Sequence, residues 1–351
     1  MHCSTAQMFA VAAAAALLAP ACSPDESTSE TVDAAPVVPD ARAQPDARSF
    51  EPTGDHYQYV IDTIQLPADS DEAEALGLDV DGDAVTDNGL GQLIQVLNGA
   101  LSTDVGALLT EQVDDGRVIV LANLQTVSFG DAERVGFWIL RGADPVPQPC
   151  LDAGDTICRR HLTGTGSFTV APGATTDSLI GGNIAGGFFN GYDFGTITIY
   201  VPVMAGAPPL AVAIVGARAY VDVGESGLMS GKLAGGLTDE EIQTNLLPQL
   251  LVLWNDRIAE QCSGTSPDCC PDGSDGDQLV DLFDSDGSCD LTLQELQDSI
   301  FLNALLEPDV DLLDAEGFYN PREDGVLDSI SIGIGFTAVP ATYDLPPDIA
   351  Q

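Results

Sequence analysis

The chain has 351 residues, of which 55 are acidic and 11 basic, so its formal net charge is −44. This charge repels phosphate backbones and attracts divalent cations, which excludes nucleic acid as an expected partner. Hydrophobic residues make up 44% of the chain, which is too apolar for a disordered acidic tail and predicts a folded core. With three histidines, the chain has little capacity for histidine chemistry.

An apolar run from Phe9 to Leu18 is too short to span a bilayer and is typical of a secretory signal peptide. The residues that follow, up to Cys22, resemble a bacterial lipobox. That resemblance implies removal of residues 1–21, acylation of Cys22 and attachment to a lipid bilayer. Two features depart from the usual pattern, because Ala19 stands where Leu is usual and the segment before the run lacks Lys and Arg. Ordinary secretion, with Cys22 removed or left free, is the alternative.

Residues 22–54 are rich in Ser, Asp, Pro and Ala, a composition that indicates a disordered tether. At ~3 Å per residue for an extended Pro-rich chain, the tether could hold the body roughly 100 Å from the membrane. Residues 55–351 are expected to form one domain. No later run predicts a membrane span, because the apolar stretch from Ile197 to Val215 contains three prolines.

The body contains a series of segments rich in β-branched and aromatic residues, separated by Gly, Pro and Asp turns. The predicted strands are residues 56–66, 117–129, 134–141, 166–171, 195–203, 210–223 and 328–339. The last strand could pair beside the first, and the strands on either side of residues 205–209 suit a hairpin. We therefore predict the α+β class, with an antiparallel β-sheet or sandwich core and peripheral helices.

Helical patterns are predicted at residues 88–98 and 102–112. Thr238 and Glu241 form a capping box that opens a longer helix towards Ala259, with a kink near Pro248. Residues 301–306 are expected to complete one last helix, which ends before Pro308.

Six cysteines lie in the body, an even number that predicts disulfides behind an export signal. They are Cys150, Cys158, Cys262, Cys269, Cys270 and Cys289. The first two close a short loop and are expected to pair. The other four allow three connectivities, of which Cys269 to Cys270 is sterically poor, and Cys289 is expected to bond within the 262–270 segment. A zinc site is disfavoured because the spacing lacks a paired Cys-x-x-Cys pattern.

The strongest chemical motif lies at residues 284–295, inside a Cys-rich segment that covers residues 262–307. Oxygen-bearing residues stand at loop positions 1, 3, 5, 7, 9 and 12, which resembles the calcium-binding loop of an EF-hand. The predicted Ca²⁺ ligands are Asp284, Asp286, Ser288, the carbonyl of Asp290, Thr292 and a bidentate Glu295. The alternative is an acidic surface turn. Position 6, where Gly is usual, carries Cys289, and we expect a disulfide to hold the unfavourable turn.

A second acidic loop at residues 79–90 also spaces carboxylates two residues apart and resembles the calcium loops of dockerin and thrombospondin type 3 repeats. That resemblance implies five ligands: Asp79, Asp81, Asp83, the carbonyl of Val85 and the carboxylate of Asp87. The bidentate acid is missing because position 12 is Leu90, and position 6 is Ala84. An Asp-rich turn that leads into a helix is the alternative. Whether the two loops pair is open.

Taken in order, the lipobox, the tether, the acidic loop after Gly77 and the closing segment from Asp328 to Phe336 resemble predicted lipoproteins of myxobacteria and related bacteria. The resemblance implies an exported protein, tethered to the outer membrane and facing the periplasm or the cell surface. It implies no activity.

Common catalytic motifs are absent from the sequence, and Gly227 to Lys232 is interpreted as a glycine turn because it lacks the residues of a phosphate loop. His161 is interpreted as structural. The Gly-rich stretch from Gly181 to Gly191 could line a binding face for a glycan or a protein, although a tight turn with buried strand aromatics is the preferred account. The leading hypothesis is a non-catalytic calcium-binding protein. The alternative is an exported hydrolase that uses a carboxylate pair, for example on glycans.

Overall fold

The computed structural model describes residues 50–101, 104–152, 154–155, 158–172, 178–193, 195–201, 209–264 and 268–350. The expected signal peptide, Cys22 and most of the expected tether lie outside these residues. Within the described part of the chain, none of the helices has both the length and the apolar character that crossing a membrane requires.

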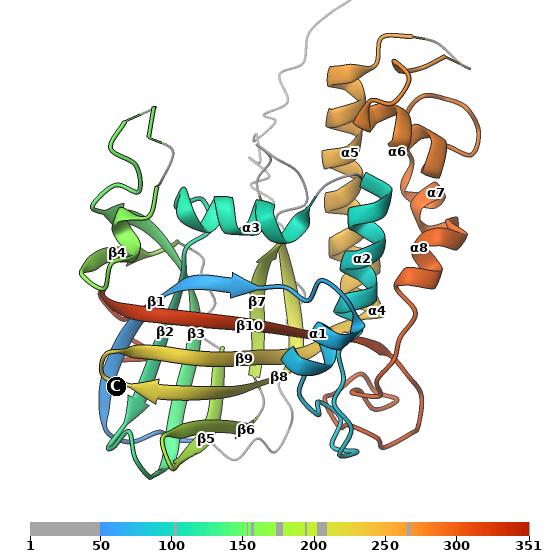
Figure 1. Cartoon of the computed structure of the whole chain (residues 1–351). Helices are drawn as coiled ribbons and strands as arrows, with labels where there is room; N and C mark the ends of the chain where they lie inside the picture. Colours follow the sequence, from blue (N-terminus) through green and yellow to red (C-terminus); the bar gives the residue numbers. More distant parts are fainter. Residues whose placement is uncertain are drawn as a thin grey trace, which may run out of the picture. The chain divides into compact units, whose positions relative to one another are not determined.

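The core of the fold is a closed ring of eight antiparallel strands (Figure 1). In ring order the strands are β1 (Asp55–Gln65), β2 (Val120–Thr126), β3 (Ala132–Val146), β5 (Leu179–Ala185), β6 (Phe188–Asp193), β8 (Leu210–Gly224), β9 (Gly227–Thr238) and β10 (Ser329–Thr342). Successive members of the ring follow one another in the sequence, so the barrel runs up and down. The predicted antiparallel sheet is therefore present, and it closes on itself.

Pairing of β1 with β10 closes the ring, with Val60 opposite Val339 and Ile64 opposite Phe336. This confirms that the last predicted strand lies beside the first. Strand side chains alternate between two faces, and both faces of β1 are buried. Tyr59 belongs to the core inside the barrel, whereas its neighbour Val60 belongs to a second core outside it.

Two further strands lie outside the ring. β4 (Gly166–Val170) pairs with β3 and β10, and β7 (Gly195–Val201) pairs with β8 as the predicted hairpin requires. The hairpin turn lies mostly outside the described residues. β4 helps to cover the outer core, where Trp138 and Leu140 of β3 are buried.

The glycine-rich segments were predicted only in part. Within Gly181 to Gly191 the expected tight turn lies at Gly186 and Gly187, between β5 and β6, and Phe189 is a buried strand aromatic as expected. The segment from Gly227 to Lys232 was expected to be a glycine turn, and this was wrong because it begins strand β9. The structure shows why glycine is used there: a Cβ on Gly231 would lie 2.4 Å from the ring of Phe336. That ring is itself stacked on Phe137 inside the barrel, with 6.3 Å between centroids. Glycine thus makes room for large side chains in a narrow barrel.

Helices pack against the barrel (Figure 1). They are α1 (Ser70–Leu76), α2 (Leu90–Leu101), α3 (Val105–Asp114), the 3₁₀ turn η1 (Arg160–Leu162), α4 (Asp239–Glu241), the π-helical turn η2 (Ile242–Leu246), α5 (Leu247–Gln261), α6 (Asp275–Phe283), α7 (Leu293–Asp298) and α8 (Ile300–Leu305). The predicted kink near Pro248 takes the form of η2, since Pro lacks the N–H that a regular turn needs. The last predicted helix is interrupted at Ser299, whose side chain caps α8 through the N–H of Leu302.

We predict that Gly231→Ala lowers the free energy of unfolding by about 1–3 kcal/mol, because the new methyl group overpacks the barrel against Phe336. Urea denaturation measures the loss. The control is Gly130→Ala, since the nearest atom to its Cβ is the Ser128 hydroxyl at 3.7 Å. Equal stability of the two variants would contradict the packing account.

Candidate metal centres

The loop of residues 284–295 connects α6 to α7, with Asp284 at the end of α6 and Thr292 as the N-cap of α7. One carboxylate oxygen from each of Asp284, Asp286 and Glu295 lies within 4.8 Å of the others. Three of the predicted ligand residues, which are spaced along the sequence, therefore lie close together in the folded chain.

Asp284 organises the first half of this loop through its two carboxylate oxygens. Oδ1 accepts hydrogen bonds from the N–H groups of Gly287 at 2.8 Å and Ser288 at 3.1 Å, and Oδ2 accepts one from Cys289 at 2.8 Å. Asp286 accepts a further bond from Ser288 at 2.9 Å. Backbone N–H groups thus hold these carboxylates in place, with acceptor capacity left over for a cation.

Glu295 closes the loop from the other side. Its Oε1 accepts hydrogen bonds from the N–H groups of Ser285 at 2.8 Å and Asp286 at 3.3 Å, and its Oε2 accepts one from the N–H of Thr292 at 2.9 Å. Burial raises the pKa of Glu295, but the hydrogen bonds from Thr292 and Ser285 outweigh it and leave the pKa below its ordinary value. Thr292 and Glu295 also form a capping box at the start of α7.

The remaining predicted ligands of this loop lie at its exposed edge. The Ser288 hydroxyl donates to the carbonyl oxygen of Asp290 at 2.9 Å, and the Thr292 hydroxyl donates to Glu295 Oε2 at 2.9 Å. Ser288, Asp290 and Thr292 therefore interact within the loop rather than with the body.

The second acidic loop, residues 79–87, has the same hydrogen-bond pattern. Asp79 Oδ1 accepts from the N–H groups of Gly82 at 2.6 Å and Asp83 at 3.1 Å, and Asp79 Oδ2 accepts from Ala84 at 3.0 Å. Asp81 accepts from Asp83 at 3.0 Å, as Asp286 does from Ser288. One oxygen from each of four carboxylates, those of Asp79, Asp81, Asp83 and Asp87, lies within 4.8 Å of the others. Val85, expected to contribute its carbonyl, has a side chain that is 58% exposed.

Asp87 occupies the place in its loop that Glu295 occupies in the other. Each accepts a hydrogen bond from the N–H at loop position 2, Val80 at 3.1 Å for Asp87 and Ser285 at 2.8 Å for Glu295. The 79–87 loop has no acid at position 12, and the carboxylate of Asp87 at position 9 makes the contact that Glu295 makes from position 12 in the other loop. Burial, together with the nearby Asp81 and Asp83 carboxylates, raises the pKa of Asp87 to about 6.

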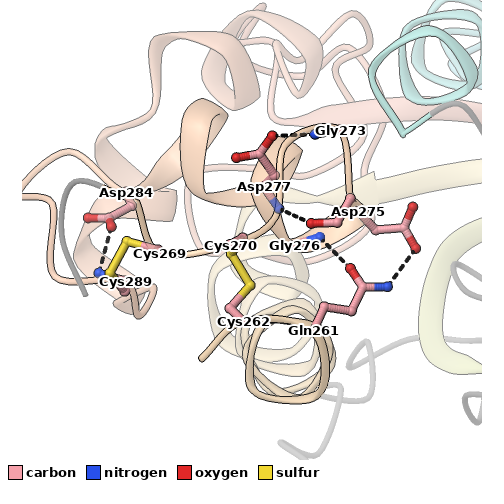
Figure 2. Close-up of a disulfide and its surroundings, with 11 residues drawn as sticks. Gln261, Cys262, Cys269, Cys270, Gly273, Asp275, Gly276, Asp277, Asp284 and Cys289 are labelled. Atoms are coloured by element: carbon pink, nitrogen blue, oxygen red, sulfur yellow. Dashed lines mark hydrogen bonds between the residues drawn. A yellow bond between two sulfur atoms is a disulfide. The ribbon is translucent and has the colours of Figure 1, made fainter. Parts of the chain in front are cut away.

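Position 6 has a left-handed backbone in both loops, with φ of 69° at Cys289 and 69° at Ala84. Cys289 is bonded to Cys269, and Cys262 to Cys270, so that two adjacent cysteines join the loop to the end of α5 (Figure 2). Cys289 is in a disulfide with the 262–270 segment, as expected, but Ala84 has the same φ without one, so the left-handed turn does not require a disulfide. What the loops share is the bond from the position-6 N–H to the first Asp.

The third disulfide joins Cys150 to Cys158, as the short loop between them favours. Asp115 lies beside this pair, and the three residues form an apparent metal-binding group. Because both sulfur atoms are in the disulfide, neither is a thiolate that could bind a metal.

The two loops do not pair with each other. Leu291, at position 8 of the 284–295 loop, instead bonds twice to the side-chain amide of Asn255 on α5. Its N–H donates to Asn255 Oδ1 at 2.8 Å, and its carbonyl oxygen accepts from Asn255 Nδ2 at 2.8 Å. Leu291 is buried, so these two backbone groups need partners. The side chain of one asparagine therefore provides the hydrogen-bond partners that the backbone of a second, paired loop would otherwise provide.

An equivalent asparagine clamp joins the 79–87 loop to the barrel. Asn88, next along the chain, accepts from the N–H of Gly333 at 2.9 Å and donates to the carbonyl oxygen of Gly333 at 3.0 Å. The loop also packs on the segment before β10, where the Tyr319 hydroxyl donates to the Val80 carbonyl at 3.4 Å. Val80 is fully buried in a small hydrophobic cluster that is separate from the main core and includes Val310 and Leu312.

The other residues singled out in the sequence lie apart from these loops. His161 is fully buried beside Phe168, as a structural residue would be. In the Gly-rich stretch, Phe189 is buried inside the barrel, whereas Phe188 is 40% exposed and stacks on Tyr220 of β8 with 5.5 Å between centroids.

A comparison with models of protein families, with curated proteins and with solved structures finds no match to the chain.

We predict that Asn255→Ala lowers the free energy of unfolding by about 1–3 kcal/mol, because it leaves the buried N–H and C=O of Leu291 without partners. Asn255→Asp keeps the acceptor but loses the donor, so its effect is expected to be intermediate. Val252→Ala, on the same helix at a side chain that is 60% exposed, is the control. Chemical denaturation provides the comparison, and equal stability of Asn255→Ala and the control would contradict the clamp.

Proposed function

We propose that this protein is a non-catalytic, calcium-binding lipoprotein of the bacterial outer membrane, in which the metal has a structural role. The observation that carries the proposal is the correspondence between the two acidic loops. They lie about 200 residues apart in the sequence, yet they share a first Asp that accepts from three N–H groups, a left-handed position 6 and a closing acid that accepts from the N–H at position 2.

The chemistry of both loops favours Ca²⁺. All the clustered groups are carboxylates, and hard cations such as Ca²⁺ take oxygen ligands in flexible geometry with six to eight ligands. Residues 284–295, with α6 and α7 on either side, are consistent with an EF-hand-like unit. Residues 79–87 form a shorter variant in which Asp87 acts as the closing ligand.

The position of each loop supports a structural role. An ion between Asp284 and Glu295 would fix α6 and α7 against α5, where Asn255 holds Leu291. An ion between Asp79 and Asp87 would fix the residues that bind β10. Extracellular calcium modules typically bind at ~10⁻⁴ to 10⁻³ M, which suits a constitutive ion better than a signal.

The proposed location follows from the N-terminal sequence, with an acylated Cys22 in the lipid bilayer and the body facing the periplasm or the cell surface. The exposed stack of Phe188 on Tyr220 is where a glycan or protein ligand of the β-rich surface would be sought.

The hydrolase alternative needs two facing carboxylates in a cleft. The apolar cavity between the barrel and its helices has no Asp or Glu among the described residues that line it, so that cavity does not support the hydrolase alternative.

We expect the protein to bind two Ca²⁺ ions, and Glu295→Gln and Asp87→Asn each to remove one of them. The reason is that each substitution neutralises the carboxylate that closes one loop. Isothermal titration gives the stoichiometry. Asp290→Asn is the control, since only the carbonyl of Asp290 is an expected ligand, and it should keep both sites.

Chelation should destabilise the wild-type protein by about 2.7 kcal/mol for each site that was held at 100 times its dissociation constant. Thermal melting with and without a chelator measures this difference. An unchanged melting temperature, with the disulfides intact, would contradict the structural role of calcium.

We expect Cys22→Ala to move the protein from the membrane fraction to the soluble exported fraction, because the thiol that would carry the lipid is removed. Metabolic labelling with a radioactive fatty acid provides an independent readout, and the label should be lost in the variant. Cys3→Ala is the control, since it lies within the expected signal peptide. Label that persists in Cys22→Ala would contradict lipidation at this residue.

A further inference from the structure

A cavity of about 140 Å³ lies where the barrel meets its helices. Part of its wall is the inner face of the barrel, including Ile139 of β3 and Phe336 of β10. The opposite part comes from helices, including Leu93 of α2 and Trp254 of α5, and from β7. An eight-stranded barrel is just wide enough to be filled by side chains or to hold one small ligand, and here a space is left.

The wall of the cavity is almost entirely hydrocarbon. An apolar space of this size excludes water and takes apolar guests, as an engineered cavity of ~150 Å³ takes benzene. On one side the lining residues are partly exposed, among them Val120, Ile199 and Val201. A guest can therefore reach the cavity from this side. A flexible aliphatic chain suits such a wall because it needs no polar partner.

Arg141 lies next to that side. It follows Ile139 by two residues on β3, so both side chains project from the same face of the strand. It is also directly opposite Val120 on β2. Its guanidinium lies over the ring of Tyr200, 4.9 Å from the centroid. Ile139, Val120 and Tyr200 all line the cavity, so Arg141 stands at its rim.

Within the described part of the chain, the charge of Arg141 is not balanced by an acidic side chain. The chain has 11 basic residues against 55 acidic ones, yet no carboxylate of the described residues lies within ion-pairing distance of Arg141. Arg159, by comparison, pairs with both Asp62 and Asp114. An exposed guanidinium beside an apolar cavity fits a ligand that has an anionic head and an aliphatic tail.

We propose that the cavity binds a free medium-chain fatty acid, with its tail among the aliphatic side chains and its carboxylate at Arg141. The volume admits only part of a long chain, which is why we favour a medium-chain acid. This site is separate from both acidic loops and does not depend on the calcium proposal. Most of the affinity comes from the tail, at about fourfold for each buried methylene, and the exposed ion pair adds about twofold to fivefold.

Trp254 provides a direct readout, because it lines the cavity, whereas Trp138 belongs to the core outside the barrel. In mature protein that carries Trp138→Phe, Trp254 is the single tryptophan. Titration with ω-bromodecanoate should quench its fluorescence in a saturable way, and decanoate should reverse the quenching. The matched control is Trp254→Phe, which leaves only Trp138 and should show no saturable quenching.

Three comparisons separate the parts of the proposal. Val120→Phe and Ile199→Phe fill the cavity from different strands, and each should weaken binding at least tenfold while the melting temperature stays close to that of the parent. Arg141→Gln should weaken binding of decanoate by about twofold to fivefold and leave decanol unaffected. Affinity should rise from hexanoate to octanoate by about fourfold per methylene.

Other results would overturn the proposal. The cavity assignment fails if Trp254 shows no saturable quenching, if Trp138 is quenched equally, or if a folded filling variant binds as tightly as the parent. The fatty-acid assignment fails if decanol and decanoate bind equally and Arg141→Gln changes neither, because the carboxylate would then have no partner at the rim.

Discussion

The pairing of β1 with β10 is the constraint on which the rest of the structure depends. It joins segments from the two ends of the described body, with Tyr59 opposite Pro340 and Gln65 opposite Gly335. Without it, both strands would expose an unpaired edge, and inward side chains such as Tyr59 and Phe336 would lose their shared core. The ends must meet across a long loop, so the entropy of closure has to be recovered from the side chains buried inside the ring.

Closure also explains how the 79–87 loop is attached. The ladder between β1 and β10 stops at Gly335, and the next groups along β10 bind the residues that follow the 79–87 loop. Gly333 bonds to the Asn88 side chain, and the Ser331 carbonyl accepts from the N–H of Gly89 at 2.9 Å. The order of this loop and the closing of the barrel are therefore coupled. The 284–295 loop is coupled instead to α5, whose Trp254 packs in the main core.

The sequence predicted these features unequally. Strands such as β1 and β10 follow a local pattern of apolar and β-branched residues, and the acidic loops follow a local spacing, so both could be recognised. β9 could not be, because its glycines are explained by the distant ring of Phe336. The Asn255 clamp lies 36 residues from Leu291, and the equivalence of Asp87 with Glu295 depends on the fold of the backbone. Each of these depends on contacts that residue spacing does not encode.

In each acidic loop, backbone N–H groups bind the first carboxylate. Asp79 and Asp284 accept three N–H groups each, which orients the carboxylates without neutralising them. Arg218 and Arg322 also reach the 79–87 loop, where they donate to the carbonyl oxygens of Asp79 and Gly82. Like charges about 4 Å apart repel by ~1 kcal/mol in water and by ~4 kcal/mol at the effective dielectric of a protein surface. A cluster of four carboxylates therefore stores repulsion that a divalent cation would relieve, and the same repulsion opposes closure of the loop when the cation is removed.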